Sequence, residues 1–274
     1  MYKRAASQCT LHADLAGPFS NNLHIWPTSL VRARHRIQNP GARCTACKRT
    51  DPKPKSFWLP AHGNPREKKQ ETILTISVDY YFTPQSPWTY LGHERFAQIA
   101  RAAGAKVRVL PIDLGGKVFP ISGGLPVGQR APQRQAYRLV ELQRYSDHLH
   151  APLNLKPKYF PVAGDDASRL IIAVEMHDGS DAAMKIGGAI FSAVWVRERN
   201  IADEKVLAEL LAECGLDAAR LEQSHSQAVA QRYEANTQQA IDAGVFGAPS
   251  YVVAGEIFWG QDRLDFVERR LNAN

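Results

Sequence analysis

The sequence predicts an α/β fold in which a βαβ unit and a final ββα unit are separated by an all-helical insertion. Two observations predict it: β-rich runs occur near both ends of residues 72–274, and segments of helical periodicity fill the middle with no strand between them. We therefore expect residues 72–274 to form one small sheet with a long helical segment inserted into its connectivity.

The first unit spans about residues 72–116. The run "ILTISVDYYF" is rich in β-branched and aromatic residues, "SPWTYLGHERFAQIARAAGA" has apolar residues at helical spacing, and "KVRVLPIDL" alternates like a second strand. These segments predict a strand, a helix and a strand in that order.

The middle region, about residues 117–226, is predicted to be helical. Four segments have helical periodicity: "QRQAYRLVELQRYSDHL", "DASRLIIAVEMHDG", "DAAMKIGGAIFSAVWVRERN" and "DEKVLAELLAECG".

In the last part, about residues 227–274, "PSYVVAGEIFWG" predicts two short strands joined by a turn at Ala254-Gly255, and "QDRLDFVERRLN" predicts the closing helix.

This element order is the thioredoxin topology with a helical domain inserted between its two halves. In that topology the catalytic tetrad opens the first helix, and a cis-proline begins the third strand. Pro249, in "GAPS", is the candidate cis-proline, and the tetrad beginning at Ser86 is "SPWT" in place of Cys-x-x-Cys.

Residues 1–70 differ in composition from the rest of the chain. They hold 13 Lys and Arg against 3 Asp and Glu, and seven of the 17 prolines, whereas the remaining residues carry 21 basic and 24 acidic side chains. Because the segment lacks lasting periodicity, we expect a basic, proline-rich, disordered extension. An organelle targeting segment is one interpretation, but a translation start assigned too far upstream is the interpretation that we favour.

The charge distribution limits the expected partners. The extension carries a net charge of +10 and the remaining residues carry −3, so nothing indicates that the folded part binds nucleic acid. No stretch has the length of a transmembrane helix and no signal peptide opens the chain, so we expect a cytoplasmic protein without a membrane partner.

Cys44 and Cys47 lack both the second ligand pair of a zinc site and the strand–helix setting of a redox pair, so no metal site is predicted.

Ser86 is the candidate catalytic residue. A helix N-terminus stabilises an anionic sulfur through its unpaired N–H groups and its dipole, even when the thiol belongs to a ligand. The Ser86 hydroxyl can donate a hydrogen bond to such a thiolate, and the absence of a thiol at Ser86 and Thr89 disfavours a dithiol oxidoreductase. The alternative is that Ser86 only caps the helix.

The segments "DYYFTPQSPWTYLG", "LKPKYFPV", "GVFGAPSYVV" and "FWGQDRLDFV" together resemble the 2-hydroxychromene-2-carboxylate isomerases. These enzymes are relatives of the class-kappa glutathione transferases in the DsbA-like thioredoxin superfamily, and the resemblance covers about residues 72–274. It implies that a glutathione thiolate adds transiently to the unsaturated, ring-opened form of an aromatic hemiketal acid and leaves again, so that glutathione acts as a catalyst.

The resemblance also implies roles for individual residues. Ser86 is similar to the serine that contacts the glutathione sulfur. The backbone of Ala248, before Pro249, resembles the stretch that pairs with the tripeptide. Gln261 and Asp262 match the pair that binds the γ-glutamyl end, although Asp262 has the alternative of capping the last helix.

The aromatic substrate has weaker candidates. Trp88, Tyr90 and Phe160 are candidate walls for its ring. Lys156 or Lys158 could bind its carboxylate. The alternative is that the aromatic residues belong to the hydrophobic core and the lysines to the solvent-exposed surface, as such residues more often do.

One position departs from the family pattern. Transferase relatives have an asparagine contact after the second strand, and its nearest match here is Gly124. Lys117 or Arg130 could replace that contact at the glycyl carboxylate, but each is more commonly a solvated charge.

Three hypotheses remain open at this point: a glutathione-dependent isomerase, a kappa-like glutathione transferase or peroxidase with the same site, and a noncatalytic thioredoxin-fold module. The sequence does not separate the first two, and it leaves a homodimer open.

Overall fold

The computed structural model describes residues 76–273, so the expected extension at residues 1–70, with Cys44 and Cys47, lies outside the described residues. Within that range, one mixed sheet has the strand order β2-β1-β3-β4. β1 (Ser77–Phe82) is parallel to β2 (Lys106–Pro111) and antiparallel to β3 (Ser250–Val253), which pairs antiparallel with β4 (Glu256–Trp259). The predicted thioredoxin topology is confirmed.

Helices connect and cover these strands. α1 (Pro87–Ala102) joins β1 to β2, and η3 (Gln261–Arg263) leads from β4 into α9 (Leu264–Leu271). The segments between β2 and β3 are η1 (Leu114–Val118), α2 (Phe119–Ser122), η2 (Val127–Gln129), α3 (Pro132–Leu149), α4 (Asp165–Asp178), α5 (Ser180–Trp195), α6 (Glu204–Glu213), α7 (Ala219–Ser224) and α8 (Gln227–Asp242). The four predicted helices of the middle region are α3 to α6, whereas no helix was predicted at α7 or α8.

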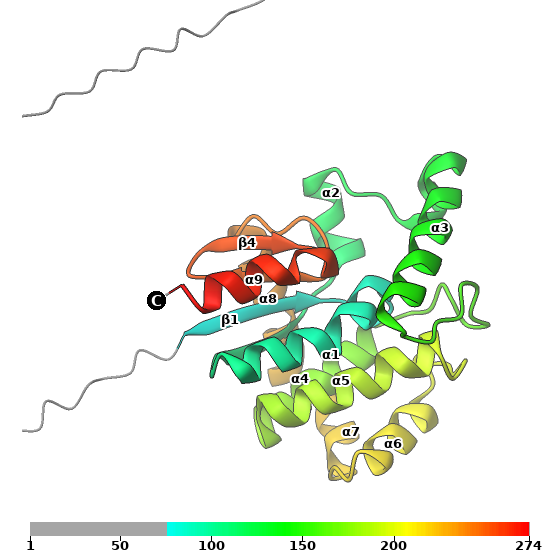
Figure 1. Cartoon of the computed structure of the whole chain (residues 1–274). Helices are drawn as coiled ribbons and strands as arrows, with labels where there is room; N and C mark the ends of the chain where they lie inside the picture. Colours follow the sequence, from blue (N-terminus) through cyan, green and yellow to red (C-terminus); the bar gives the residue numbers. More distant parts are fainter. Residues whose placement is uncertain (1–75, 274) are drawn as a thin grey trace, which may run out of the picture. The chain divides into compact units, whose positions relative to one another are not determined.

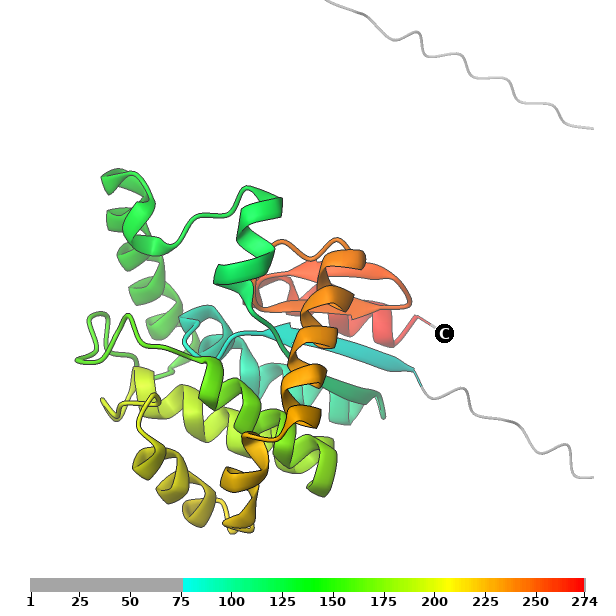
Figure 2. The same ribbon diagram turned by 180° about the vertical axis from the view of Figure 1, so that it is seen from behind.

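The alternation of side chains along β1 divides the core between the two faces of the sheet. Tyr80 and Phe82 are fully buried in the larger cluster, which includes residues of α1, α4, α5 and α9, whereas Tyr81 is buried in a second cluster with Ala240 of α8. Figure 1 shows α1 and α9 on one face of the sheet, and Figure 2 shows α8 on the other.

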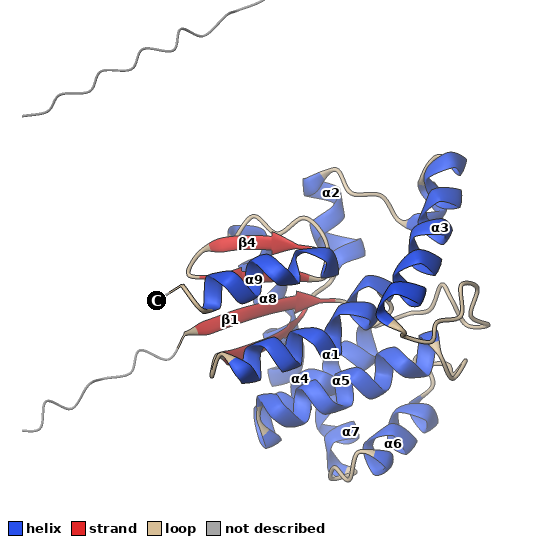
Figure 3. Ribbon diagram, viewed as in Figure 1, coloured by secondary structure: helices blue, strands red, loops and turns tan. Residues whose placement is uncertain are grey.

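The β3–β4 hairpin follows from its two turn residues. Ala254 and Gly255 both have positive φ, 49° and 82°, as a two-residue turn of the hairpin-favouring kind requires. This confirms the predicted hairpin. Figure 3 shows a single small sheet among many helices. Within residues 76–273, none of those helices is long and apolar enough to cross a membrane.

Candidate functional site

The turn from β1 into α1 places Ser86 at the helix N-terminus. Ser86 has extended backbone angles (φ −80°, ψ 124°), and its Oγ accepts a hydrogen bond from the backbone N–H of Thr89 at 3.2 Å. Pro87 occupies the first helical position, where its missing N–H costs nothing. Ser86 is 7% exposed, and its hydroxyl proton is donated to no described residue. The predicted cap is therefore present, and it uses only the acceptor side of the hydroxyl.

Pro249 lies at the same edge of the sheet. The Ala248–Pro249 peptide bond is cis, as expected from the position of Pro249 before the third strand. Because Tyr81 pairs with Ser250 in an antiparallel register, Pro249 stands beside the end of β1, from which the chain continues to Ser86. The carbonyl of Pro249 accepts from Gly260 N at 2.8 Å, whereas the N–H and C=O of Ala248 bond to no described residue. Ala248 therefore keeps a free backbone edge next to the helix N-terminus.

Gly260 begins the segment that carries the predicted γ-glutamyl contacts. A φ of 98° is easily adopted only by glycine, and a Cβ on Gly260 would lie 2.4 Å from Oδ1 of Asp262. The Asp262 carboxylate is thus folded back over Gly260, and it pairs with Arg263 at 2.8 Å while remaining 39% exposed. The alternative role of Asp262 as a helix cap has no support here, because neither η3 nor α9 has a side-chain cap hydrogen bond.

Gln261 has a different environment from Asp262. Its side chain is almost fully buried, and its Oε1 accepts from Nη1 of Arg95 at 3.2 Å. A Cβ on Gly92 of α1 would lie only 2.7 Å from Cβ of Gln261, so η3 packs directly on α1. Gln261 therefore fixes the turn that presents Asp262.

The aromatic candidates contact α3 and the segment that follows it. Trp88 meets Tyr145 of α3 edge to face with ring centroids 5.9 Å apart, and the Tyr90 hydroxyl donates to the Pro152 carbonyl at 2.7 Å. Burial raises the pKa of Tyr145, and the Asp262 carboxylate raises it further. Sequence reasoning missed Tyr145, which brings α3 into contact with Trp88.

The candidates at residues 156–160 separate into two environments. Phe160 is partly buried against Trp195 at a centroid distance of 4.9 Å, and the Arg138 guanidinium lies over its ring. Lys156 and Lys158 are exposed, and neither forms an ion pair with another described residue, although Lys158 lies 5.0 Å from the Tyr159 ring centre. Arg138 was also missed, although its spacing from Leu142 and Tyr145 marks the inward face of α3.

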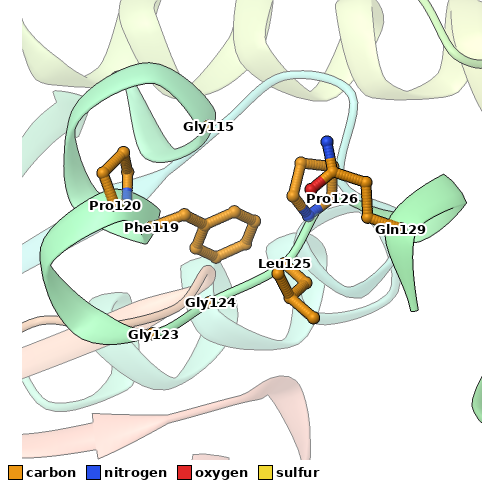
Figure 4. A pocket seen from close by; sticks show the side chains of 8 residues that line it. All are labelled: Gly115, Phe119, Pro120, Gly123, Gly124, Leu125, Pro126 and Gln129. Atoms are coloured by element: carbon orange, nitrogen blue, oxygen red, sulfur yellow. The ribbon is translucent and has the colours of Figure 1, made fainter. Parts of the chain in front are cut away.

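The segment after β2 leaves the sheet at the same edge, because β1 and β2 are parallel. It lines a shallow hollow of about 430 Å³ (Figure 4), formed by Gly115, Phe119, Pro120, Gly123, Gly124, Leu125, Pro126 and Gln129. A Cβ on Gly124 would lie 2.1 Å from the Phe119 ring, so Phe119 fills the space that an asparagine at this position would need.

The two cations proposed to replace that asparagine have partners of their own. Lys117 forms an ion pair with Glu234 of α8, and Nε of Arg130 donates to the Leu125 carbonyl at 2.8 Å. Lys117 is therefore an exposed surface charge, as expected, and Arg130 is partly buried.

Comparison with known proteins shows which family the chain belongs to. The family model described as DSBA-like thioredoxin domain matches residues 77–272. A 2-hydroxychromene-2-carboxylate isomerase of Pseudomonas sp. (strain C18) is 31% identical over 201 residues, which cover 71% of this chain and 90% of the relative. The glutathione S-transferase kappa 1 of Caenorhabditis elegans is 24% identical over 69% of this chain and 88% of its own length.

A solved structure gives the same result at the level of the fold. The structure of a 2-hydroxychromene-2-carboxylate isomerase superposes with a TM-score of 0.59 at 28% identity, covering 72% of this chain and 95% of that one. The chain is therefore a DSBA-like thioredoxin-domain enzyme that belongs to the 2-hydroxychromene-2-carboxylate isomerase family.

Proposed function

We propose that the protein is a glutathione-dependent isomerase of 2-hydroxychromene-2-carboxylate-like aromatic hemiketal acids. The observation that carries the proposal is the buried Ser86 hydroxyl at the N-terminus of α1, beside cis-Pro249, with its proton uncommitted. A hydroxyl in that position can stabilise a sulfur anion supplied by a ligand, although it cannot itself form a disulfide.

The described residues fit a bound glutathione. The free N–H and C=O of Ala248, next to Pro249, suit pairing with an extended peptide backbone. The half-exposed Asp262 carboxylate suits a ligand ammonium, and the buried Gln261 holds the turn that carries it. When bound, glutathione would supply a nucleophilic sulfur for reversible addition to an unsaturated substrate.

The chain itself would contribute acid–base control and positioning. The Ser86 hydroxyl donates to the sulfur, and the dipole of α1 favours its anionic form, so the thiol pKa falls toward working pH. Trp88, Tyr90 and Tyr145 form an aromatic border at this end of α1, which would orient a planar substrate and exclude water.

A kappa-like glutathione transferase is the second candidate. The kappa-class relative from Caenorhabditis elegans favours it, because the same thiolate site would serve conjugation to another electrophile. The distinction lies in the electrophile and not in the sulfur site.

Parallel assays test the two candidates. The purified full chain is mixed with 2-hydroxychromene-2-carboxylate, with and without glutathione, and isomerisation is followed by ultraviolet absorbance. Conjugation of chlorodinitrobenzene is measured in the same buffer. Isomerisation that requires glutathione supports the proposal, conjugation alone supports the transferase, and isomerisation at the same rate without glutathione contradicts the sulfur mechanism.

A further inference from the structure

Arg138 is the most deeply buried lysine or arginine among residues 76–273. It projects from α3 and is 9% exposed, yet its guanidinium donates no hydrogen bond and forms no ion pair within the described part of the chain. Its Nη2 is fully enclosed without a partner. Buried guanidinium groups are ordinarily paired with an acceptor, so this one calls for an anion.

Aromatic rings hold the Arg138 side chain in place. Its guanidinium carbon lies 5.3 Å from the ring centre of Phe160 and 5.8 Å from that of Trp195. Rings packed over a guanidinium stabilise its charge through their faces but accept none of the N–H bonds in its plane. The N–H groups in the plane of the Arg138 guanidinium are therefore held in a fixed orientation and still lack an acceptor. A carboxylate can accept two parallel hydrogen bonds from a guanidinium group.

The surrounding charge is positive. Burial and, to a smaller extent, the neighbouring Arg130 guanidinium together lower the pKa of Arg138 to about 10. Arg138 therefore remains charged at neutral pH, and two cations that disfavour each other here would both be stabilised by one bound anion.

Arg138, Phe160 and Trp195, here called the Arg138 cluster, lie on the side of the molecule that borders Ser86. Gly164 follows Phe160 by four residues, and a Cβ on Gly164 would lie 2.1 Å from Oε1 of Gln85, the neighbour of Ser86. Tyr145, two turns along α3 from Arg138, contacts Trp88 of α1. Two separate connections thus join the Arg138 cluster to the N-terminus of α1.

We propose that Arg138 binds the carboxylate of an aromatic substrate, in the role that the sequence suggested for Lys156 or Lys158. The inference rests on the proposed function for the identity of the substrate class. The exposed lysines offer a charge without orientation, whereas Arg138 is fixed by Phe160 and Trp195.

Binding of a small aromatic acid provides a test that does not need turnover. Salicylate and its neutral counterpart salicylamide are titrated into the full chain by calorimetry. We expect Arg138→Gln to weaken salicylate at least tenfold and to leave salicylamide within twofold, and Arg138→Lys to give an intermediate affinity for salicylate. Arg134→Gln, one turn earlier on α3 and exposed, is the matched control and should stay within twofold of the parent.

Several results would overturn the proposal. These are equal binding of salicylate and salicylamide by the parent, no binding of salicylate by the parent, or unchanged salicylate affinity in Arg138→Gln. A tenfold loss of glutathione affinity in Arg138→Gln with salicylate unaffected would assign Arg138 to a glutathione carboxylate. If Arg138→Gln does not fold, Arg138→Lys replaces it in the test. An affinity of Arg138→Lys for salicylate equal to that of the parent would contradict binding of the carboxylate by the Arg138 guanidinium.

The isomerase assay separates this inference from the proposed function. If isomerisation requires glutathione but the KM of Arg138→Gln equals that of the parent, only the Arg138 inference fails. If salicylate depends on Arg138 while no isomerisation occurs, the anion site stands and the proposed reaction fails.

Discussion

The Oγ of Ser86 accepts a hydrogen bond from the backbone N–H of Thr89 at 3.2 Å, so Ser86 caps α1 whatever else it does. Capping uses a lone pair of the hydroxyl, whereas stabilising a thiolate uses its proton. The two roles are therefore compatible, and a variant that removes the hydroxyl should show both losses at once.

Ser86→Ala should raise the pKa of the bound glutathione thiol by about one unit or more, equivalent to about 1.4 kcal/mol of lost thiolate preference. The loss of the cap should also cost about 1 kcal/mol of folding stability. Ultraviolet titration of the bound thiolate measures the first effect, and chemical denaturation measures the second.

Ser226→Ala is the matched control for this experiment. Ser226 caps α8 in the same way, its Oγ accepting from Val229 N at 3.3 Å. We expect a similar stability loss there and no change in the thiol pKa. If Ser86→Ala and its parent titrate together, Ser86 is a cap only and the proposed mechanism is wrong.

Much of the fold could be predicted from the sequence because its strands and amphipathic helices carry regular apolar patterns. α8 could not, because its inward face is partly polar: Asn236 and Thr237 are buried there and bond to the carbonyls of Pro111 and Tyr233. A polar side chain satisfied inside the protein cannot be distinguished from a solvated one by periodicity alone.

The candidate site shows the same limit. Ser86 and Pro249 could be located because helix-opening and strand-opening positions have sequence signatures. The burial of Gln261 and the contact of Tyr145 with Trp88 depend on how η3 and α3 pack on α1, and the enclosure of Arg138 depends on its packing against Phe160 and Trp195. Those contacts are long-range and leave no local signal.

Gly92 provides a test of that packing. A Cβ there would lie 2.7 Å from Cβ of Gln261 and 2.9 Å from the Tyr251 hydroxyl oxygen, so Gly92→Ala should destabilise the fold by about 1 to 3 kcal/mol despite the better helix propensity of alanine. Displacement of Gln261 should also weaken glutathione binding. Thermal melts and calorimetric titration measure the two effects.

Gly187→Ala is the comparison for Gly92→Ala. Gly187 is also inside a helix, but its nearest atom beyond the helix backbone would lie at an ordinary 3.4 Å, in the Phe191 ring. We expect this variant to be neutral or slightly stabilising. Equal stability of the two variants would show that η3 does not press on α1 as described.

His93 should make the fold sensitive to mild acid. It is buried in α1, with Nε2 2.9 Å from the Met184 carbonyl oxygen and Nδ1 3.2 Å from the Tyr80 hydroxyl. Burial lowers the pKa of His93, although the hydrogen bond to Met184 opposes the shift. Below about pH 6.5 the unfolded chain therefore binds a proton that the folded chain does not. As the pH is lowered further, the free energy of unfolding decreases by up to about 1.4 kcal/mol per pH unit.

Denaturation curves at several values between pH 5 and pH 7.5 measure this dependence. His93→Gln should lose the part of the slope that His93 contributes, whereas His148→Gln, at an exposed position on α3, should keep the parent slope. A His93→Gln slope identical to that of the parent would assign the acid sensitivity to other groups.

Asp262 separates binding from structure most directly. If its carboxylate pairs with the γ-glutamyl ammonium, Asp262→Asn should weaken glutathione by about 1.5 to 3 kcal/mol, because a charge-assisted hydrogen bond is lost. Stability should hardly change, since Asp262 makes no cap hydrogen bond and its pair with Arg263 is half exposed and worth at most about 1 kcal/mol. Calorimetric titration with glutathione and thermal melts without ligand measure the two quantities.

Asp265→Asn is the control for Asp262→Asn, because Asp265 lies three residues further on, is 76% exposed and pairs only loosely with Arg95 at 3.5 Å. It removes the same charge from the same end of α9, so a general loss of negative potential would weaken both variants alike. A specific contact would weaken Asp262→Asn alone. Unchanged affinity in Asp262→Asn would remove Asp262 from the glutathione site, and a lower melting temperature without an affinity loss would leave Asp262 and Gln261 as structural residues that hold η3 against α1.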